Sequence, residues 1–271
     1  IFLIQNDLKP MHTDQFSAGV RRLFGPLSTS LTATYIHGEN GVGFYPANRK
    51  APDPVTGARD FVPVPGFGNV LVSDNNRQTW YTSLQVSAEK PFNADLAIGG
   101  VQWGGSLAYT FGVAREQGDL FNFDFPTVTA SPITPTGSDE THRLVLAATV
   151  GLLWQVKAST LVTLGSGLPF NISDASAGWA NFRPLRNGGR LSDPIQYSQV
   201  DLRFTKELTL TPGGDKATAF AECFNLFNAA NFGGYDGFIP PDTDPPNPNF
   251  GKPSKTIGPP RSFQLGVSYK F

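Results

Sequence analysis

The stretch RSFQLGVSYKF, residues 261–271, alternates between apolar side chains and polar or small ones. Its apolar positions are Phe263, Leu265, Val267, Tyr269 and Phe271. Between them lie Ser262, Gln264, Gly266, Ser268 and Lys270. Successive side chains of a β-strand point to opposite faces, so this alternation predicts a closing strand with one apolar face and one polar face.

The same alternation recurs along the chain. It is clear over residues 27–35, 80–88, 101–113 and 200–210, and weaker over 16–20, 144–150 and 156–164. A further strand is expected over 219–228, where Glu222 shares the parity of Phe220 and Phe224, so that its faces stay unassigned. No convincing helical periodicity is present. The sequence therefore predicts an all-β chain of about nine strands.

The predicted connections alternate between short and long. Short ones lie near 25–26, 90–93, 152–155 and 211–214, and long ones near 39–73, 114–140, 171–198 and 231–260. Long structureless loops are uncommon in compact soluble domains. Tight turns at one end and long loops at the other are typical of an antiparallel up-and-down transmembrane β-barrel.

Strand length supports the same interpretation. A tilted strand needs about 9 to 11 residues to cross a bilayer, whereas strands of soluble proteins usually have about 5 or 6. Aromatic residues also lie near the expected membrane boundaries: Tyr35 and Trp80 toward the long loops, and Phe24, Tyr269 and Phe271 toward the short turns. A large soluble β-sandwich is the alternative, but it rarely combines long strands with one-sided loops.

Composition excludes several classes of protein. The formal net charge of −1 gives no basic surface for nucleic acid, and the single cysteine, Cys223, allows no intrachain disulfide. No apolar run is long enough for a transmembrane helix. The opening residues IFLIQNDLKP lack an initiator Met and a basic region before an apolar core, so no signal peptide is expected in this chain.

An odd number of strands places the two ends of the chain on opposite sides of the membrane. Bacterial barrels usually have an even number of strands, and lipid does not tolerate open sheet edges. We therefore expect residues 1–271 to be the C-terminal part of a larger barrel.

Several segments resemble a known family at this point. QVDLRFTKELTLTPG, AFAECFNLFNAANFG and FGKPSKTIGPPRSFQLGVSYKF are similar to the closing strands of TonB-dependent outer-membrane receptors. DQFSAGVRRLFGPLSTSLTATYIHG is similar to hairpins in the middle of the same barrels. The resemblance is nearest to the subgroup that carries an N-terminal carboxypeptidase-regulatory-like domain.

The resemblance implies a barrel of about 22 strands in the outer membrane of a Gram-negative-type bacterium, with a plugged lumen. It implies TonB-energised uptake of a scarce nutrient that long extracellular loops capture. Its partners would be outer-membrane lipid and the barrel-assembly machinery, which would read Phe263, Leu265, Val267, Tyr269 and Phe271 as its signal. Because no plug domain or TonB-contacting segment is recognised here, the TonB complex would act only through parts outside this chain.

Sequence motifs for other chemistry are lacking. His12, His37 and His142 are far apart in the sequence and show no metal-ligand or catalytic spacing, so no enzyme activity and no cofactor are expected. Asp242 and Asp244 alternate in a proline-rich loop but lack the other ligands of a calcium loop. The nutrient and its binding residues stay unassigned. Two alternative functions remain: a passive porin, and a soluble β-rich module for binding or adhesion.

The aromatic residues of the predicted loops have two possible roles. They could line a ligand vestibule, or they could anchor the loops to one another. These residues are Phe44, Tyr45, Phe121, Phe123, Trp179 and Tyr235.

Overall fold

The computed structural model describes residues 1–48, 62, 64–92, 100–121, 125, 127–178, 182–210 and 215–270. Apart from one 3₁₀ turn, η1 (Leu153–Gln155), all regular structure within these residues is β-strand. The all-β prediction is therefore confirmed.

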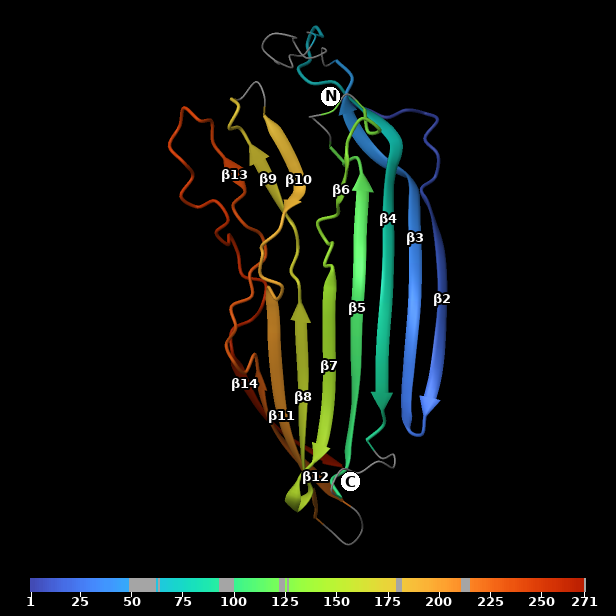
Figure 1. The fold of residues 1–271 in the computed structure, drawn as a ribbon, viewed down its shortest axis with the longest axis vertical. Helices are drawn as coiled ribbons and strands as arrows, with labels where there is room; N and C mark the ends of the chain where they lie inside the picture. Colours follow the sequence, from blue (N-terminus) through green and yellow to red (C-terminus); the bar gives the residue numbers. More distant parts are fainter. Residues whose placement is uncertain are drawn as a thin grey trace.

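Nine strands of the described chain follow one another as neighbours in one curved sheet (Figure 1). Each pairs antiparallel with the next. They are β2 (His12–Phe24), β3 (Leu27–Pro46), β4 (Leu71–Lys90), β5 (Trp103–Gln117), β7 (His142–Gly151), β8 (Val156–Gly165), β11 (Tyr197–Thr209), β12 (Lys216–Phe224) and β14 (Ser262–Lys270). The predicted number of strands and their up-and-down order are confirmed.

The register carries one apolar face across all nine strands. Residues paired across neighbouring strands point to the same side, and Phe16 pairs with Tyr35, Leu84 with Phe111, and Leu265 with Ala221. We call this side the apolar face; Leu31, Val86, Tyr109, Leu144, Val162, Phe204 and Val267 also belong to it. The opposite side, the polar face, includes Ser30, Ser87, Thr110, Arg203, Glu222 and Gln264.

The structure also assigns the faces of β12, which the sequence left open. Ala219 and Ala221 pair with Val267 and Leu265, so they lie on the apolar face. Phe220 pairs with Gly266 on the polar face. The predicted strand over 219–228 ends early, at Phe224, because Asn225 adopts a left-handed backbone with φ of 49°.

The connections differ at the two ends of the sheet (Figure 1). The turn between β2 and β3 has only two residues, Gly25 and Pro26. The connection after β4 is longer than predicted, since β5 begins at Trp103. At the opposite end, which we call the loop end, the connections are 47–70, 118–141, 166–196 and 225–261.

The loop end contains more regular structure than the sequence predicted. β3 and β4 extend to Pro46 and from Leu71, so the first long loop is shorter than the predicted 39–73. β1 (Phe2–Leu3) pairs with β4 and β6 (Ile133–Pro135) with β5. A separate small sheet joins β9 (Phe170–Asp174) to β10 (Arg183–Gly189) and β13 (Phe238–Ile239).

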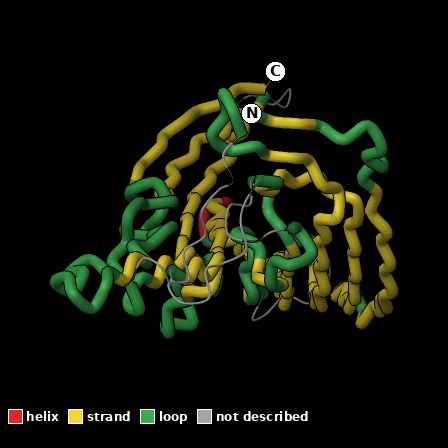
Figure 2. Tube along the Cα trace, turned by 90° about the horizontal axis from the view of Figure 1, so that it is seen from above, coloured by secondary structure: helices red, strands yellow, loops and turns green. Residues whose placement is uncertain are grey.

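The sheet follows an arc when it is seen from above (Figure 2). Within the described residues, β2 pairs only with β3 and β14 only with β12. Every residue of β2 is exposed, and so are eight of the nine residues of β14. Both edges therefore offer backbone donors and acceptors and an uncovered apolar face.

Candidate functional site

Most of the buried side chains are gathered at the loop end. Leu71, Val128, Phe170 and Ala175 are buried there. Buried polar residues lie beside them: Asn48, Ser73, Asp74, Ser131, Asp139, Asn225 and Asn231. Buried polar groups cost free energy unless they are hydrogen-bonded, so the partners of these groups define how the loop end is held.

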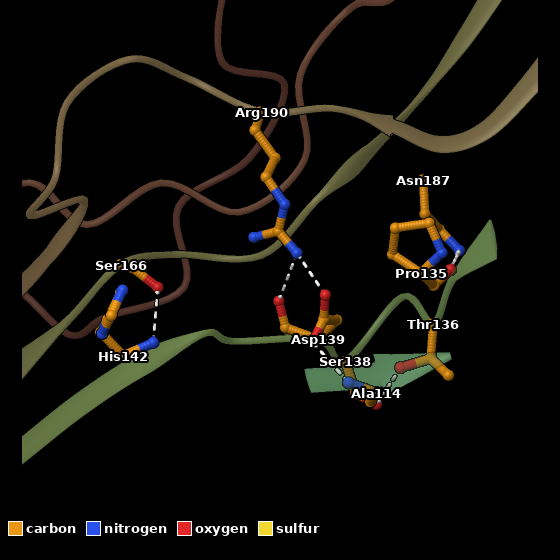
Figure 3. A network of polar contacts seen from close by, with 9 residues as sticks. All are labelled: Ala114, Pro135, Thr136, Ser138, Asp139, His142, Ser166, Asn187 and Arg190. Atoms are coloured by element: carbon orange, nitrogen blue, oxygen red, sulfur yellow. Dashed lines mark hydrogen bonds and ion pairs between the residues drawn. The ribbon is translucent and has the colours of Figure 1, made fainter. Parts of the chain in front are cut away.

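Asp139 is the centre of one hydrogen-bonded network (Figure 3). Its side chain is 4% exposed, and its Oδ1 accepts a hydrogen bond of 2.7 Å from the backbone N–H of Ala114 in β5. Arg190 donates to both the Asp139 carboxylate and the Asp139 carbonyl oxygen. Asp139 thus joins β5 to the connection that follows β10.

A second set of contacts runs beside the first (Figure 3). The amide of Asn187 donates to the carbonyl oxygen of Pro135 at 2.8 Å. The Ser166 hydroxyl accepts from the backbone N–H of His142 at 3.0 Å. The connections 118–141 and 166–196 are therefore held to each other and to β5 and β7 by single side chains.

A cavity of about 190 Å³ lies between β6 and β10. An ion pair between Asp119 and Arg186 lies on its wall. The other lining residues are mostly proline, glycine or apolar, among them Pro132, Ile133, Pro135, Pro184 and Leu185. This cavity is small for a ligand site, since pockets for organic ligands usually enclose about 300 to 1,000 Å³.

The connection between β12 and β14 is anchored by two asparagines. Asn225 is 1% exposed, and its amide donates to the carbonyl oxygens of Ala229 and Pro259, each at 3.0 Å. Asn231 is 2% exposed; its side chain accepts from the Ser198 N–H at 2.7 Å and donates to the Ser198 carbonyl at 3.0 Å. The NLFN and NFG segments of the predicted resemblance therefore have a structural role here.

The same connection forms a larger cavity of about 460 Å³. Its lining residues are Phe238, Ile239, Pro240, Pro241, Asp242, Asp244, Pro246, Asn247 and Phe250. Both aspartates singled out in the sequence thus line one cavity. Two neighbouring loop residues have shifted pKa values. Burial and the charge of Asp193 raise the pKa of Tyr235. Hydrogen bonds from Ser176 lower the pKa of Asp174.

The loop aromatics that the structure describes mainly contact one another. Phe44 stacks on Phe121 with ring centroids 5.7 Å apart, and Phe2 contacts both rings edge-on. Tyr235 packs against Phe170 at 5.3 Å. The structure thus places Phe44, Phe121 and Tyr235 in anchoring contacts, whereas Phe123 and Trp179 lie outside the described residues.

The structure brings two of the three histidines together. His12 and His37 lie 3.3 and 3.5 Å from the Glu39 carboxylate, and His37 stacks on Trp80. His142 contacts the Tyr109 hydroxyl at 2.7 Å. Nowhere in the described chain do three or more His, Cys, Asp or Glu side chains form a group that could hold a metal ion.

The predicted assembly residues Phe263, Leu265, Val267 and Tyr269 lie together on the apolar face of β14, from 56% to 80% exposed. Phe271 lies outside the described residues. On the polar face near the same edge, the guanidinium carbon of Arg203 lies 4.1 Å from the centroid of the Phe220 ring. A Cβ atom at Gly266 would overlap that ring. Gly266 therefore makes room for an aromatic residue of β12.

Comparisons with known proteins identify a structural neighbour. No protein-family model matches the chain, and no curated protein matches its sequence. The outer membrane transporter YddB from Escherichia coli is similar in structure, with a TM-score of 0.65 and 13% sequence identity. The match covers 100% of this chain and 34% of that chain, so the chain spans about a third of that transporter's length.

This similarity shows the fold: an antiparallel sheet of the kind found in an outer-membrane barrel transporter. It agrees with the continuous apolar face and the one-sided long connections. In the described part of the chain, no helix has the length and apolar character needed to cross a membrane.

Proposed function

We propose that this chain is the closing part of a larger outer-membrane barrel that takes up a scarce nutrient with energy from the TonB complex. The observation that carries the proposal is the apolar face, which is continuous over nine strands, highly exposed at both edges and partly exposed between them. Lipid would cover this face, since an exposed apolar surface of this extent is unusual in a soluble protein. The role is transport, without enzymatic catalysis.

The two free edges support a larger barrel. β2 and β14 each leave one side without a described partner, and lipid does not tolerate unpaired backbone groups. Further strands of the same protein would pair with both edges. The structural neighbour is consistent with this, because the match covers only 34% of that transporter.

Two other interactions belong to the proposal. The barrel-assembly machinery would recognise the apolar residues of β14 together with Phe271. Contact with the TonB complex, and closure of the lumen by a plug, would come from other parts of the protein. The loop end would lie outside the cell and capture the nutrient.

The proposal is tested by expressing the gene with its natural upstream sequence. We expect the protein in the outer-membrane fraction and nutrient uptake that stops when the TonB complex is removed. Recovery in the soluble fraction without detergent would favour a soluble binding or adhesion module instead. Uptake that continues without the TonB complex, together with open conductance in lipid bilayers, would favour a passive porin.

A further inference from the structure

The 460 Å³ cavity in the connection between β12 and β14 has an unusual set of polar groups. Its size falls within the range typical of sites for small organic ligands. Its walls are largely apolar, with two phenylalanines, one isoleucine and three prolines. The charged side chains that line it are Asp242 and Asp244, and among the described lining residues there is no Lys, Arg or His.

Most backbone donors of the cavity are already used. The N–H groups of Phe238, Asp242, Asp244 and Phe250 donate to other groups of the protein. Proline has no N–H, so the three proline residues contribute none. The lining backbone thus offers few hydrogen-bond donors to a ligand.

Asn247 is also unavailable as a donor. Its Nδ2 donates to the Asp236 carboxylate at 3.0 Å and to the Phe238 carbonyl at 2.9 Å. Its Oδ1 accepts from the Asn249 N–H at 2.9 Å. These bonds fix the wall of the cavity and leave the two carboxylates as its available polar groups.

The two carboxylates have few partners of their own. Asp242 and Asp244 are both exposed, and the Asp242 carboxylate accepts no hydrogen bond from the described residues. Asp244 accepts one long bond, at 3.5 Å, from Thr243. An ionised carboxylate can only accept hydrogen bonds, so a ligand that displaces solvent from these two groups must bring donors and positive charge.

We propose that this cavity binds a small organic cation: an ammonium or guanidinium group carried on an apolar body. The cation would lie between Asp242 and Asp244, and the apolar body would pack on the prolines and Phe250, whose ring face can also attract a cation. Anionic ligands are disfavoured because the cavity supplies no positive side chain. The proposal rests on the receptor function for its biological role, as a capture site, but not for the binding itself.

A calcium ion is a poorer match for the same residues. Calcium prefers six to eight oxygen ligands, whereas two aspartates supply the carboxylates here and the remaining walls are mostly hydrocarbon. The apolar walls would contribute nothing to a bare metal ion.

The test uses the full chain, extracted from outer membranes in mild detergent, and three probes in which a phenyl ring carries a two-carbon chain. Phenethylamine is cationic, phenylacetate is anionic and 2-phenylethanol is neutral. We expect saturable binding of phenethylamine, measured by calorimetry. Binding of phenylacetate or phenylethanol should be at least about tenfold weaker, which corresponds to about 1.4 kcal/mol.

Asp242→Asn with Asp244→Asn removes the charge and keeps the shape of the side chains. This double variant should bind phenethylamine at least about tenfold more weakly. Asp7→Asn with Glu89→Gln is the matched control, because it removes two exposed negative charges outside the cavity lining. That control should bind as the parent chain does.

Several results would overturn the cation site. They are no saturable binding of phenethylamine, equal binding of phenylacetate, unchanged binding by the Asp242 and Asp244 variant, or exclusion of the amine by millimolar Ca²⁺ alone. Binding with no TonB-dependent uptake would keep the cation site and reject the transport function. Uptake without amine binding would keep the transport function and reject the cation site.

Discussion

The nine-strand sheet and the loop end place their side chains in opposite environments. In the sheet, large apolar residues such as Phe16, Val20 and Leu265 are more than 60% exposed. At the loop end, polar residues such as Asn225 and Asp139 are less than 5% exposed. The sheet therefore depends on its backbone ladder and on what covers its apolar face, whereas the loop end depends on individual side-chain hydrogen bonds.

This difference predicts two kinds of sensitivity to mutation. A change in the sheet should matter according to the face on which the residue lies. A change at the loop end should matter according to how many bonds the side chain makes.

The largest effect is expected for a charge on the apolar face. Leu265→Arg in β14 should disfavour the membrane-inserted state by about 2 to 4 kcal/mol, because lipid would face the new charge. Gln264→Arg, on the polar face next to it, should be tolerated. The measurement is the fraction of heat-modifiable, folded protein in outer membranes; equal loss for both variants would contradict the assignment of the two faces.

The next effect concerns Asn225. Asn225→Ala removes donors to two carbonyl oxygens and places alanine at a φ of 49°, so the free energy of unfolding should fall by about 2 to 3 kcal/mol. The readout is the midpoint of urea unfolding in detergent.

Asn6→Ala, at an exposed turn, is the matched control and should leave the midpoint unchanged. Asn225→Asp keeps the acceptor that takes the Ala229 N–H but sets a buried carboxylate against the two carbonyl oxygens, so its midpoint should fall at least as far as that of Asn225→Ala. A midpoint for Asn225→Ala equal to that of the parent would mean that the loop end does not depend on this side chain.

The regular parts of the fold were predictable from the sequence because they follow one local rule. Period-two alternation located eight of the nine strands of the sheet, and connection length located the loop end. The strand over 219–228 was expected without an assignment of its faces. The apolar alternation of residues 263–269 matches β14 and its register with β12. The prediction depended only on which side chains are neighbours in the chain.

The small sheet and the polar networks of the loop end were not predictable in this way. β13 has two residues and pairs with β9, which lies more than 60 residues earlier in the chain. β10 reads RPLRNGG, a composition that disfavours strands. Asp139 and Arg190 are 51 residues apart, so no local pattern relates them.

The boundary of β12 shows the same limit at a single residue. The apolar pattern continues from Phe224 into Leu226 and Phe227, which favours a longer strand. The strand ends because Asn225 turns left-handed and its side chain bonds to the connection that follows. Only the position of Ala229 and Pro259 in space reveals this.

A third prediction concerns a tight contact on the polar face, between Gly266 and Phe220. Gly266→Ala should lower the free energy of unfolding by about 1 to 3 kcal/mol, because its Cβ atom would overlap the Phe220 ring. Adding Phe220→Ala should recover much of this loss. Gly68→Ala, where a Cβ atom meets no atom within 4 Å, is the control in urea unfolding; equal midpoints for the two alanine variants would contradict the overlap.

The smallest effect separates an ion pair with one buried partner from an exposed pair. Asp139 is 4% exposed beside Arg190, which is 36% exposed, whereas Lys216 and Glu207, 2.7 Å apart in the sheet, are each about half exposed. Solvent screens an exposed pair strongly, while residues in one buried network couple by about 1 to 2 kcal/mol. Double-mutant cycles with alanine should therefore give clear coupling between Asp139 and Arg190 and a much smaller one between Glu207 and Lys216. The same cycles in 0.5 M salt should weaken the exposed pair more than the Asp139–Arg190 pair, since screening acts on groups that solvent reaches. Equal coupling in the two cycles would mean that Asp139 gains no more from its burial at the loop end than Glu207 does in the open sheet.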